Sequence, residues 1–331
     1  MNSVEFKSGA ASDYDFGGRL SADFPSQVII DVTEVCNLAC IHCPHPEFKE
    51  SPFYEARHLD PALNARIVDE VRDRGAGLTQ YIRYSSEGEP LVHPKGYEMI
   101  EYAVRNSGVF VTLTTNGTIM NEKRTRRLLD SGVHMIDISI DAMTEETYAK
   151  VRVNGDLNVT RTNVINLLTW IRQSGSATKV VVSFIEQPQN THEVDAFRSF
   201  WTEQGVNSVV VRRLHSAAGA VVNVARIMRT EQRTEQRRPC VYPWERIVLT
   251  PRGYLSFCPA DWTQGSSICD YRETSVADVW QSDFYKKLRA AHTSNDYAAH
   301  GFCGQCPDWK QTRWPDEGQG YADLVKEMRQ G

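Results

Sequence analysis

The sequence predicts an α/β fold with a parallel sheet, followed by a small cysteine-rich domain. Between residues 27 and 212, six short β-branched and apolar segments alternate with segments of helical periodicity. Such alternation favours right-handed strand–helix–strand units, and therefore parallel strands. From Pro239 onward the composition changes to Cys, Trp, Tyr and Pro, which indicates a second and smaller unit.

The individual elements follow from local signals. Runs rich in Val, Ile, Thr and aromatic residues predict strands at 27–33, 81–84, 109–114, 134–140, 179–185 and 208–212. Helical patterns lie between them at 61–74, 95–106, 122–131, 159–173 and 192–204, with a further short helix capped by Thr144. The clearest helix start is Asp60-Pro61, an N-cap followed by proline at the first helical position.

Composition limits the class of protein. With 331 residues, 41% hydrophobic and 24% charged, the chain has the make-up of an ordinary globular protein. A net charge of −5 gives no case for nucleic acid or an anionic membrane as partner. The first twenty residues are polar, and no apolar run approaches a membrane span. Eight cysteines in tight groups without a secretion signal indicate metal binding and a cytoplasmic, reducing compartment.

The alternation of strands and helices stops near Leu214. A charged segment with a tandem Thr-Glu-Gln-Arg repeat follows, and we interpret it as a solvated linker. The predicted organisation is an N-terminal extension (1–24), the strand–helix domain (25–215), the linker or loop (216–238), the cysteine-rich domain (239–310) and a C-terminal helix (311–331).

The first cysteine group, Cys36, Cys40 and Cys43, has the spacing C-x3-C-x2-C and follows the first predicted strand. Soft thiolate ligands select iron–sulfur or zinc sites. Three cysteines bind only three irons of a cubane, and the fourth iron keeps an open position for chemistry. The alternatives are a zinc site completed by His42 or His45, or three unrelated thiols.

This triplet after a strand resembles the signature of the radical S-adenosylmethionine (radical SAM) enzymes. The resemblance implies a partial (β/α)6 TIM-like barrel whose open side admits substrate. It also implies a [4Fe-4S] cluster whose open iron is chelated by SAM, which is cleaved to methionine and a 5′-deoxyadenosyl radical. His42 occupies the position where the family usually carries an aromatic residue near the adenine.

The same resemblance implies further cofactor contacts along the barrel. Gly88 and Glu89 are similar to the family's Gly-Gly-Glu segment at the SAM amino group, with Glu87 in place of the first glycine. Read alone, these residues form a charged turn. The remaining implied SAM contacts are the strand-end residues Asn116, Ser139 and Asp141, the carboxylate-binding Arg152, and Ser183 at the ribose or adenine. Their alternative roles are turn chemistry and satisfied core hydroxyls.

The second cysteine group, Cys240, Cys258, Cys303 and Cys306, resembles the opening of a SPASM domain. No cysteine follows Cys306, so the resemblance implies one fully coordinated auxiliary [4Fe-4S] cluster, as in the shortened twitch version. The ligand spacing is similar to that of the aminocyclitol dehydrogenase of the butirosin pathway. A four-cysteine zinc site is the alternative. Cys269 is left over, either as an inert thiol, an exchangeable auxiliary ligand or a hydrogen-atom donor.

The resemblance implies an oxidoreductase that oxidises a secondary alcohol of a sugar or aminocyclitol to a ketone, in antibiotic (aminoglycoside) or surface-glycan biosynthesis. The auxiliary cluster would accept the electron, and a reductase with flavodoxin or ferredoxin would supply the reducing electron. Glu245 and His215 are candidate bases, near Arg213, Tyr242 and Trp244. The alternatives are an epimerase using Cys269, a SPASM-type peptide-modifying enzyme, and a zinc-bound structural module.

Overall fold

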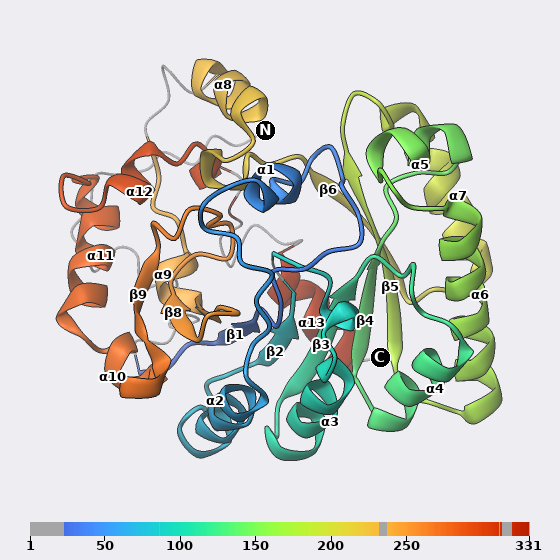
Figure 1. The fold of residues 1–331 in the computed structure, drawn as a ribbon, viewed down its shortest axis with the longest axis horizontal. Helices are drawn as coiled ribbons and strands as arrows, with labels where there is room; N and C mark the ends of the chain where they lie inside the picture. The colour runs from blue at the N-terminus through green and yellow to red at the C-terminus, as the bar shows by residue number, and fades with distance from the viewer. Residues whose placement is uncertain (1–22, 86, 232–236, 311, 313–319, 331) are drawn as a thin grey trace.

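The structure is a computed structural model that describes residues 23–85, 87–231, 237–310, 312 and 320–330. Nine strands form one sheet (Figure 1). They are β1 (Gln27–Ile30), β2 (Tyr81–Tyr84), β3 (Phe110–Thr115), β4 (Met135–Ser139), β5 (Lys179–Glu186), β6 (Ser208–Arg213), β7 (Arg246–Leu249), β8 (Tyr254–Ser256) and β9 (Ser267–Asp270). Their order in the sheet is β6-β5-β4-β3-β2-β1-β7-β8-β9.

The helices alternate with the strands in the first two thirds of the chain, and α9 to α12 lie around β8 and β9 (Figure 1). They are α1 (His45–Lys49), α2 (Pro61–Arg74), α3 (Gly96–Asn106), α4 (Glu122–Ser131), α5 (Glu145–Val151), α6 (Leu157–Ser174), α7 (Val194–Gln204), α8 (Val222–Glu231), α9 (Tyr242–Glu245), α10 (Val276–Trp280), α11 (Asp283–Ser294), α12 (Gly301–Gln305) and α13 (Tyr321–Gln330).

Strands β1 to β6 are paired in parallel, and each pair is joined through helical segments. The parallel α/β architecture is the one that the strand–helix alternation predicts, and its form is the partial TIM barrel that the family resemblance implies. Helix α2 begins where expected, because the Asp60 side chain accepts a hydrogen bond from the backbone N–H of Ala62 and Pro61 follows it. The α4 helix ends at Gly132 in the left-handed conformation, with φ of 76°.

The sheet does not stop at the end of the barrel. β7, which the sequence analysis does not predict as a strand, pairs in parallel with β1, from Gln27–Arg246 to Ile30–Leu249. β8 and β9 then continue the sheet in antiparallel pairing. The cysteine-rich segment therefore extends the barrel sheet, and its main chain is hydrogen-bonded directly to the barrel's first strand.

The two faces of the parallel sheet carry different partners. One face packs against the surrounding helices and forms the main core, which includes Ile82, Val111 and Ile136 from alternate strand positions. The other face forms the barrel interior. There Tyr81, Met135 and Val181 pack against α13, the C-terminal helix, which lies behind β2–β4 in Figure 1.

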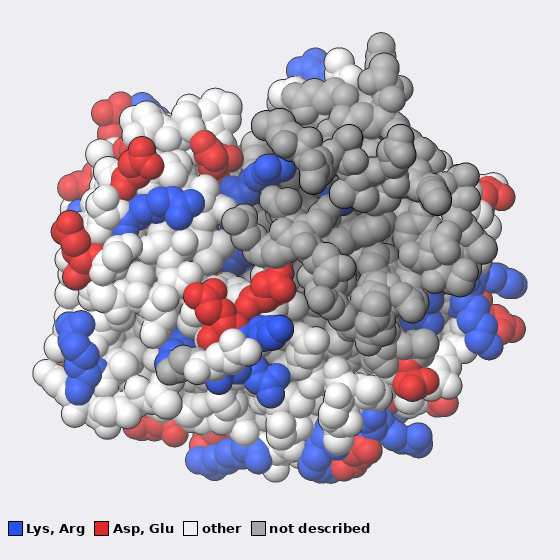
Figure 2. Space-filling model, turned by 180° about the vertical axis from the view of Figure 1, so that it is seen from behind, with Lys and Arg blue, Asp and Glu red and all other residues white. Residues whose placement is uncertain are grey.

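Two parts of the predicted organisation differ from or fall outside the structure. The segment 216–238 contains the helix α8, ten residues long, where the sequence analysis expects only a linker or loop. The charged Thr-Glu-Gln-Arg repeat begins at Thr230, so it overlaps only the end of this helix. Nearly all of the N-terminal extension and residues 232–236 of the linker lie outside the described residues. On the described part of the face in Figure 2, acidic and basic side chains are interspersed.

Candidate functional site

The loop after β1 carries the first cysteine group. Its main chain is tied to the end of α5, because the N–H groups of Ala39 and Ile41 donate to the carbonyls of Val153 and Val151 at 2.9 and 3.2 Å. Burial, together with nearby negative charges, raises the pKa of Cys36 and of Cys43 to about 12. Thiolates in such a place need a bound cation as partner, which is what a metal cluster supplies.

A buried charged group lies directly beside this loop. The Arg152 guanidinium contacts Oδ2 of Asp141 through Nε at 2.7 Å and Nη2 at 2.5 Å, and its Nη1 lies 3.6 Å from Sγ of Cys40. Nε2 of His42 lies 3.5 Å from the same Asp141 oxygen, and Nδ1 of His42 lies 3.2 Å from Nε2 of Gln187. Burial lowers the pKa of His42 to about 4, so its ring is neutral at ordinary pH.

Arg152 and Asp141 thus form one unit with a ligand cysteine. Both side chains are almost completely buried, at 7% and 0% exposure. Asp141 has φ of 62°, a left-handed conformation that is costly for a residue with a side chain, and its Oδ1 accepts from the N–H of Ile185 at 2.6 Å. The structure therefore brings three of the predicted SAM contacts, His42, Asp141 and Arg152, to one place beside Cys40.

The turn after β2 lies against the same loop. The N–H of Glu89 donates to the carbonyl of Val35 at 2.9 Å, and a Cβ on Gly88 would meet the Thr33 carbonyl oxygen at 2.2 Å. The Glu89 carboxylate accepts from Oγ1 of Thr115 and from the N–H groups of Leu91 and Asn116. These three hydrogen bonds join the loops after β2 and β3. They use three of the four acceptor sites of the buried carboxylate, and one site is left for a cationic amine.

The other predicted SAM contacts are divided between two places. The Asn116 side chain donates to Oδ1 of Asn37 at 2.9 Å, next to Cys36. Ser139, at the end of β4, lines the same cavity as the cysteine loop. Ser183 instead donates a short hydrogen bond to Oδ1 of Asp137 deeper in the barrel and is 2% exposed.

The second cysteine group comes from three segments of the C-terminal domain: Cys240 before α9, Cys258 after β8, and Cys303 and Cys306 at α12. The thiols of Cys240, Cys258, Cys303 and Cys306 lie near enough to influence one another electrostatically. Burial raises the pKa of Cys303 to about 12 and of Cys306 to about 11, and the Arg237 charge opposes both shifts.

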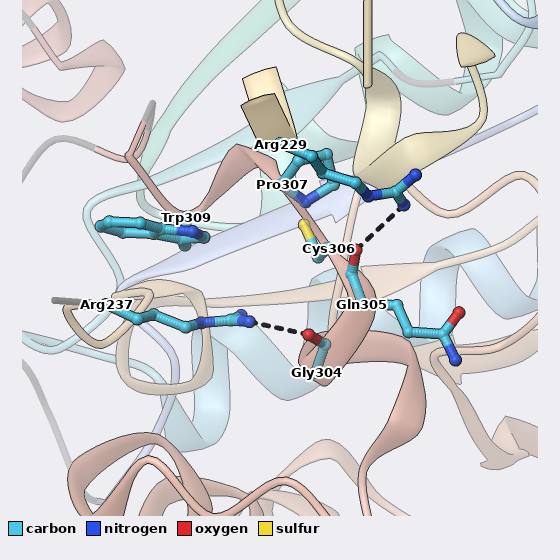
Figure 3. A pocket seen from close by; sticks show the side chains of 7 residues that line it. All are labelled: Arg229, Arg237, Gly304, Gln305, Cys306, Pro307 and Trp309. Carbon is cyan, nitrogen blue, oxygen red and sulfur yellow. Dashed lines mark hydrogen bonds between the residues drawn. The ribbon is translucent and has the colours of Figure 1, made fainter. Parts of the chain in front are cut away.

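Two arginines hold the backbone around the last two of these cysteines. Arg237 donates to the carbonyls of Gly304 and Cys303 at 3.0 and 2.6 Å, and Arg229 of α8 donates to the carbonyl of Gln305 at 3.1 Å. Figure 3 shows the Arg237–Gly304 and Arg229–Gln305 contacts, with Cys306 between the two arginine side chains. These residues, with Trp309, line a pocket of about 450 Å³. Arg229 and Arg237 both belong to the segment that the sequence analysis interprets as a solvated linker. The described parts of this segment on either side of residues 232–236 therefore support the second cysteine group.

Both cysteine groups open into one cavity of about 1560 Å³, whose lining includes all seven predicted ligands. In the described part of the chain, no three His, Cys, Asp or Glu side chains converge tightly enough for a single metal ion. Sets of three and of four buried thiols fit two separate iron–sulfur clusters by the chemistry of their donors.

The predicted catalytic residues are distributed differently. Glu245 and His215 line the shared cavity, as do Arg213 and Tyr242. Nδ1 of His215 accepts from the N–H of Ala217 at 3.1 Å, and Oε2 of Glu245 accepts from Nη2 of Arg246 at 2.8 Å. Cys269 lies on β9 against the apolar core and is not among the residues that line this cavity. The structure does not bring it to the site.

Sequence reasoning missed a set of polar residues inside the barrel, namely Arg83, Asp137, Arg212 and Tyr321. A signal was present, because Arg83 and Asp137 alternate with Ile82 and Ile136 in otherwise apolar strands. A charged residue at an inward position of a parallel strand is uncommon in a plain core and marks a functional interior.

Family comparisons agree with this geometry. Residues 30–197 match the model of the Radical SAM superfamily, and residues 240–307 match that of the SPASM iron–sulfur cluster-binding domain. The chain therefore belongs to the Radical SAM superfamily. Membership brings a [4Fe-4S] cluster and SAM as cofactors, and the second domain brings auxiliary iron–sulfur binding.

Curated relatives have several different activities. The AdoMet-dependent heme synthase of Methanosarcina barkeri is 31% identical over 39% of this chain and 34% of its own length. The mycofactocin maturase MftC of Mycobacterium ulcerans is 26% identical over 60% of this chain and 50% of its own. The chain thus spans a third to a half of the length of these two relatives. A tungsten-containing aldehyde ferredoxin oxidoreductase cofactor-modifying protein of Pyrococcus furiosus is 23% identical over 81% and 72%.

Solved structures show the same fold at low identity. BtrN in complex with AdoMet and 2-DOIA superposes with a TM-score of 0.59 at 16% identity, covering 89% of this chain and 96% of BtrN. Streptococcus suis SuiB bound to the precursor peptide SuiA gives 0.64 at 15% identity, covering 96% and 76%. The similarity to BtrN is therefore one of structure. No helix among the described residues is long and apolar enough to cross a membrane.

Proposed function

We propose that the chain is a radical SAM oxidoreductase that oxidises a secondary alcohol of a sugar or aminocyclitol to a ketone. When bound, the two cofactor sites supply a hydrogen-abstracting 5′-deoxyadenosyl radical and a one-electron acceptor. The observation that carries the proposal is the single cavity lined by both cysteine groups. A carbinol that has lost a hydrogen atom becomes a ketone by losing one proton and one electron, and the cavity offers a destination for each.

The chain itself supplies the proton acceptor. Because Nδ1 of His215 accepts a hydrogen bond from the N–H of Ala217, the ring proton lies on Nε2, which therefore donates rather than accepts. The Glu245 carboxylate keeps acceptor capacity beside Arg246 and lines the cavity. We assign the proton-accepting role to Glu245 and an orienting hydrogen bond to His215.

The shape of the molecule supports the small-molecule substrate. BtrN, whose complex contains AdoMet and 2-DOIA, is matched over 96% of its length. On this likeness we place the reaction in antibiotic (aminoglycoside) or surface-glycan biosynthesis. A cytoplasmic location and a flavodoxin or ferredoxin as electron donor stay predictions.

A peptide-modifying activity is the second candidate. The mycofactocin maturase is a sequence relative, and SuiB bound to its precursor peptide shares the fold. An epimerase that returns a hydrogen atom from Cys269 has less support, because that thiol lies outside the lining of the cavity.

The test uses the full chain, reconstituted without oxygen, with SAM, a strong reductant and a panel of hexoses and aminocyclitols deuterated at the carbinol carbon. We expect deuterium in 5′-deoxyadenosine and one ketone for each SAM consumed. Replacing Cys258 by alanine should leave deoxyadenosine formation and abolish the ketone. Product that exchanges its carbon-bound deuterium for solvent hydrogen without forming a ketone would establish epimerisation instead. Reaction with a peptide alone would establish the second candidate.

A further inference from the structure

Two arginines in the barrel interior are not used by the chemistry above. Arg83 lies on β2 and Arg212 on β6, at opposite sides of the parallel sheet. Their side chains are 20% and 28% exposed, and both line the cavity that also contains the two cysteine groups. They therefore face the space in which a substrate must bind to meet the radical.

One carboxylate serves both arginines. Oδ2 of Asp137, on β4, accepts from Nη2 of Arg212 at 2.8 Å and lies 4.0 Å from Nη2 of Arg83. The other oxygen of Asp137 is occupied by the Ser183 hydroxyl. Asp137 is 1% exposed and does not line the cavity, whereas both guanidinium groups do. The buried carboxylate neutralises one of the two positive charges. The cluster carries a net charge of one positive unit.

The arginines are also held by neutral groups. Nε and Nη2 of Arg83 donate to Oγ1 of Thr114 at 3.1 and 2.9 Å. The Arg83 guanidinium lies 3.7 Å from the centre of the Tyr321 ring, and that of Arg212 lies 5.6 Å from it. The hydroxyl of Tyr321 donates to Thr112 at 3.1 Å, which fixes the ring in place. Tyr321 of the C-terminal helix α13 thus provides an aromatic ring that both guanidinium groups face.

Several donors of this pair remain available. Within the described residues, Nη1 of Arg83 and both Nε and Nη1 of Arg212 make no hydrogen bond to the chain. Two like charges inside a protein cavity repel each other, and a second anion relieves the repulsion. The planar fork of an arginine suits the two oxygens of a carboxylate or phosphate.

We propose that Arg83 and Arg212 bind an anionic group of the substrate, a carboxylate or a phosphate, at the end of the cavity formed by α13. This inference rests on the proposed function for the identity of the cavity and narrows its substrate class. The substrate is then an anionic sugar derivative, because a polycationic aminocyclitol would be repelled by the same pair. Asp137 and Tyr321 position the two arginines.

The test measures binding and is separate from turnover. Reconstituted full-length protein with SAM is titrated calorimetrically with D-glucuronate, D-glucose 6-phosphate, D-glucosamine and D-glucose. We expect one of the two anionic sugars to bind at least about tenfold more tightly than the neutral and cationic sugars, since hydrogen bonds to charged groups are strong. The two anions tell carboxylate from phosphate recognition. Equal binding of all four sugars, or no binding of either anion, would overturn the inference.

Variants assign the effect to the arginines. R83Q and R212Q should each lower the affinity for the preferred anion about tenfold and leave that for glucose unchanged. R83K, which keeps the charge and loses the fork, should lie between. R105Q is the matched control, because Arg105 is 67% exposed on α3 and pairs only with Glu101 among the described residues. Anion affinity that is unchanged in both glutamine variants would reject the assignment.

Further measurements separate a failure of the anion site from a failure of the proposed function. The iron and acid-labile sulfide content and the circular dichroism spectrum of the variants should match those of the wild type, which shows that they fold and hold both clusters. If anions bind as expected but no alcohol is oxidised, the proposed function fails and the anion site stands. If an uncharged alcohol is oxidised to a ketone and anions do not bind, the proposed function stands and the anion site is rejected.

Discussion

Gly88 shows how tightly single residues constrain the cofactor site. A Cβ there would lie 2.2 Å from the Thr33 carbonyl oxygen and 2.7 Å from that of Val35, so only glycine allows the turn after β2 to touch the cysteine loop. Asp31 and Glu87 lie at the same junction, where the Glu87 N–H donates to Oδ2 of Asp31 at 3.1 Å. In both contacts the backbone of the turn after β2 meets a segment that is distant in the sequence.

Gly88→Ala should therefore disturb the first cysteine group alone. We expect reconstituted protein to lose about four irons and the matching sulfide, the content of one cubane, and to retain the auxiliary cluster. Iron and acid-labile sulfide analysis measures this. Gly301→Ala is the control, since a Cβ at Gly301 meets nothing within 4 Å. Full iron content in Gly88→Ala would contradict the close contact.

Asp31 should make stability depend on pH. Burial raises the pKa of Asp31 and of neighbouring Glu87 well above the usual carboxyl range, so the folded state favours the protonated forms. This stabilisation is complete below the ordinary carboxyl pKa and is lost as pH rises through the raised values. Thermal unfolding of the reconstituted protein should show a midpoint that falls toward alkaline pH.

The variant Asp31→Asn should flatten that fall, because it removes one of the two acids. Asp283→Asn, at a side chain that is 86% exposed, should follow the wild-type profile. A profile of Asp31→Asn parallel to that of the wild type would show that the pair does not hold a proton in this range.

At the scale of elements, the C-terminal helix α13 contributes both to the core of the barrel and to the position of Arg83. Tyr321, Leu324, Val325 and Met328 recur at helical spacing and pack on the inner face of the sheet. The amphipathic pattern predicts a helix, but a helix with an apolar stripe could cover any exposed apolar face. Its place inside the barrel makes it both a part of the core and the support of Arg83.

Leu324→Ala should lower the free energy of unfolding by about 2–5 kcal/mol, the usual cost of a cavity at a buried leucine. Chemical denaturation followed by circular dichroism measures the change. Lys326→Ala on the exposed side of the same helix is the control. If both variants behaved alike, α13 would not be packed in the barrel in solution.

At the scale of the whole molecule, one sheet runs through both domains. The β1–β7 pairing places the loop after β1 and the segment around Cys258 at the same cavity. A rigid connection of this kind fixes the separation between the two cofactor sites, which a flexible linker would not do.

The two sites should nevertheless be loaded independently. Changing Cys36, Cys40 and Cys43 together to alanine should leave about four irons per chain, because a site of four thiolates holds one cubane. Deoxyadenosine formation should disappear in the same protein. Loss of all iron, or survival of SAM cleavage, would contradict two separate clusters.

By itself the sequence determined the strand–helix alternation, the helix caps, both cysteine groups and their chemistry, because these signals are local in the chain. The predicted cofactor contacts at Gly88 and Arg152 rest on the resemblance of their segments to those of the radical SAM enzymes. Only the tertiary structure decided that the two cysteine groups share a cavity, that β7 extends the barrel sheet and that α13 fills its interior. The same holds for the pairing of Arg83 and Arg212 around Asp137. These contacts join residues that are far apart in the sequence. Each surface could pack against several partners, and no local sequence pattern shows which of them tertiary packing selects.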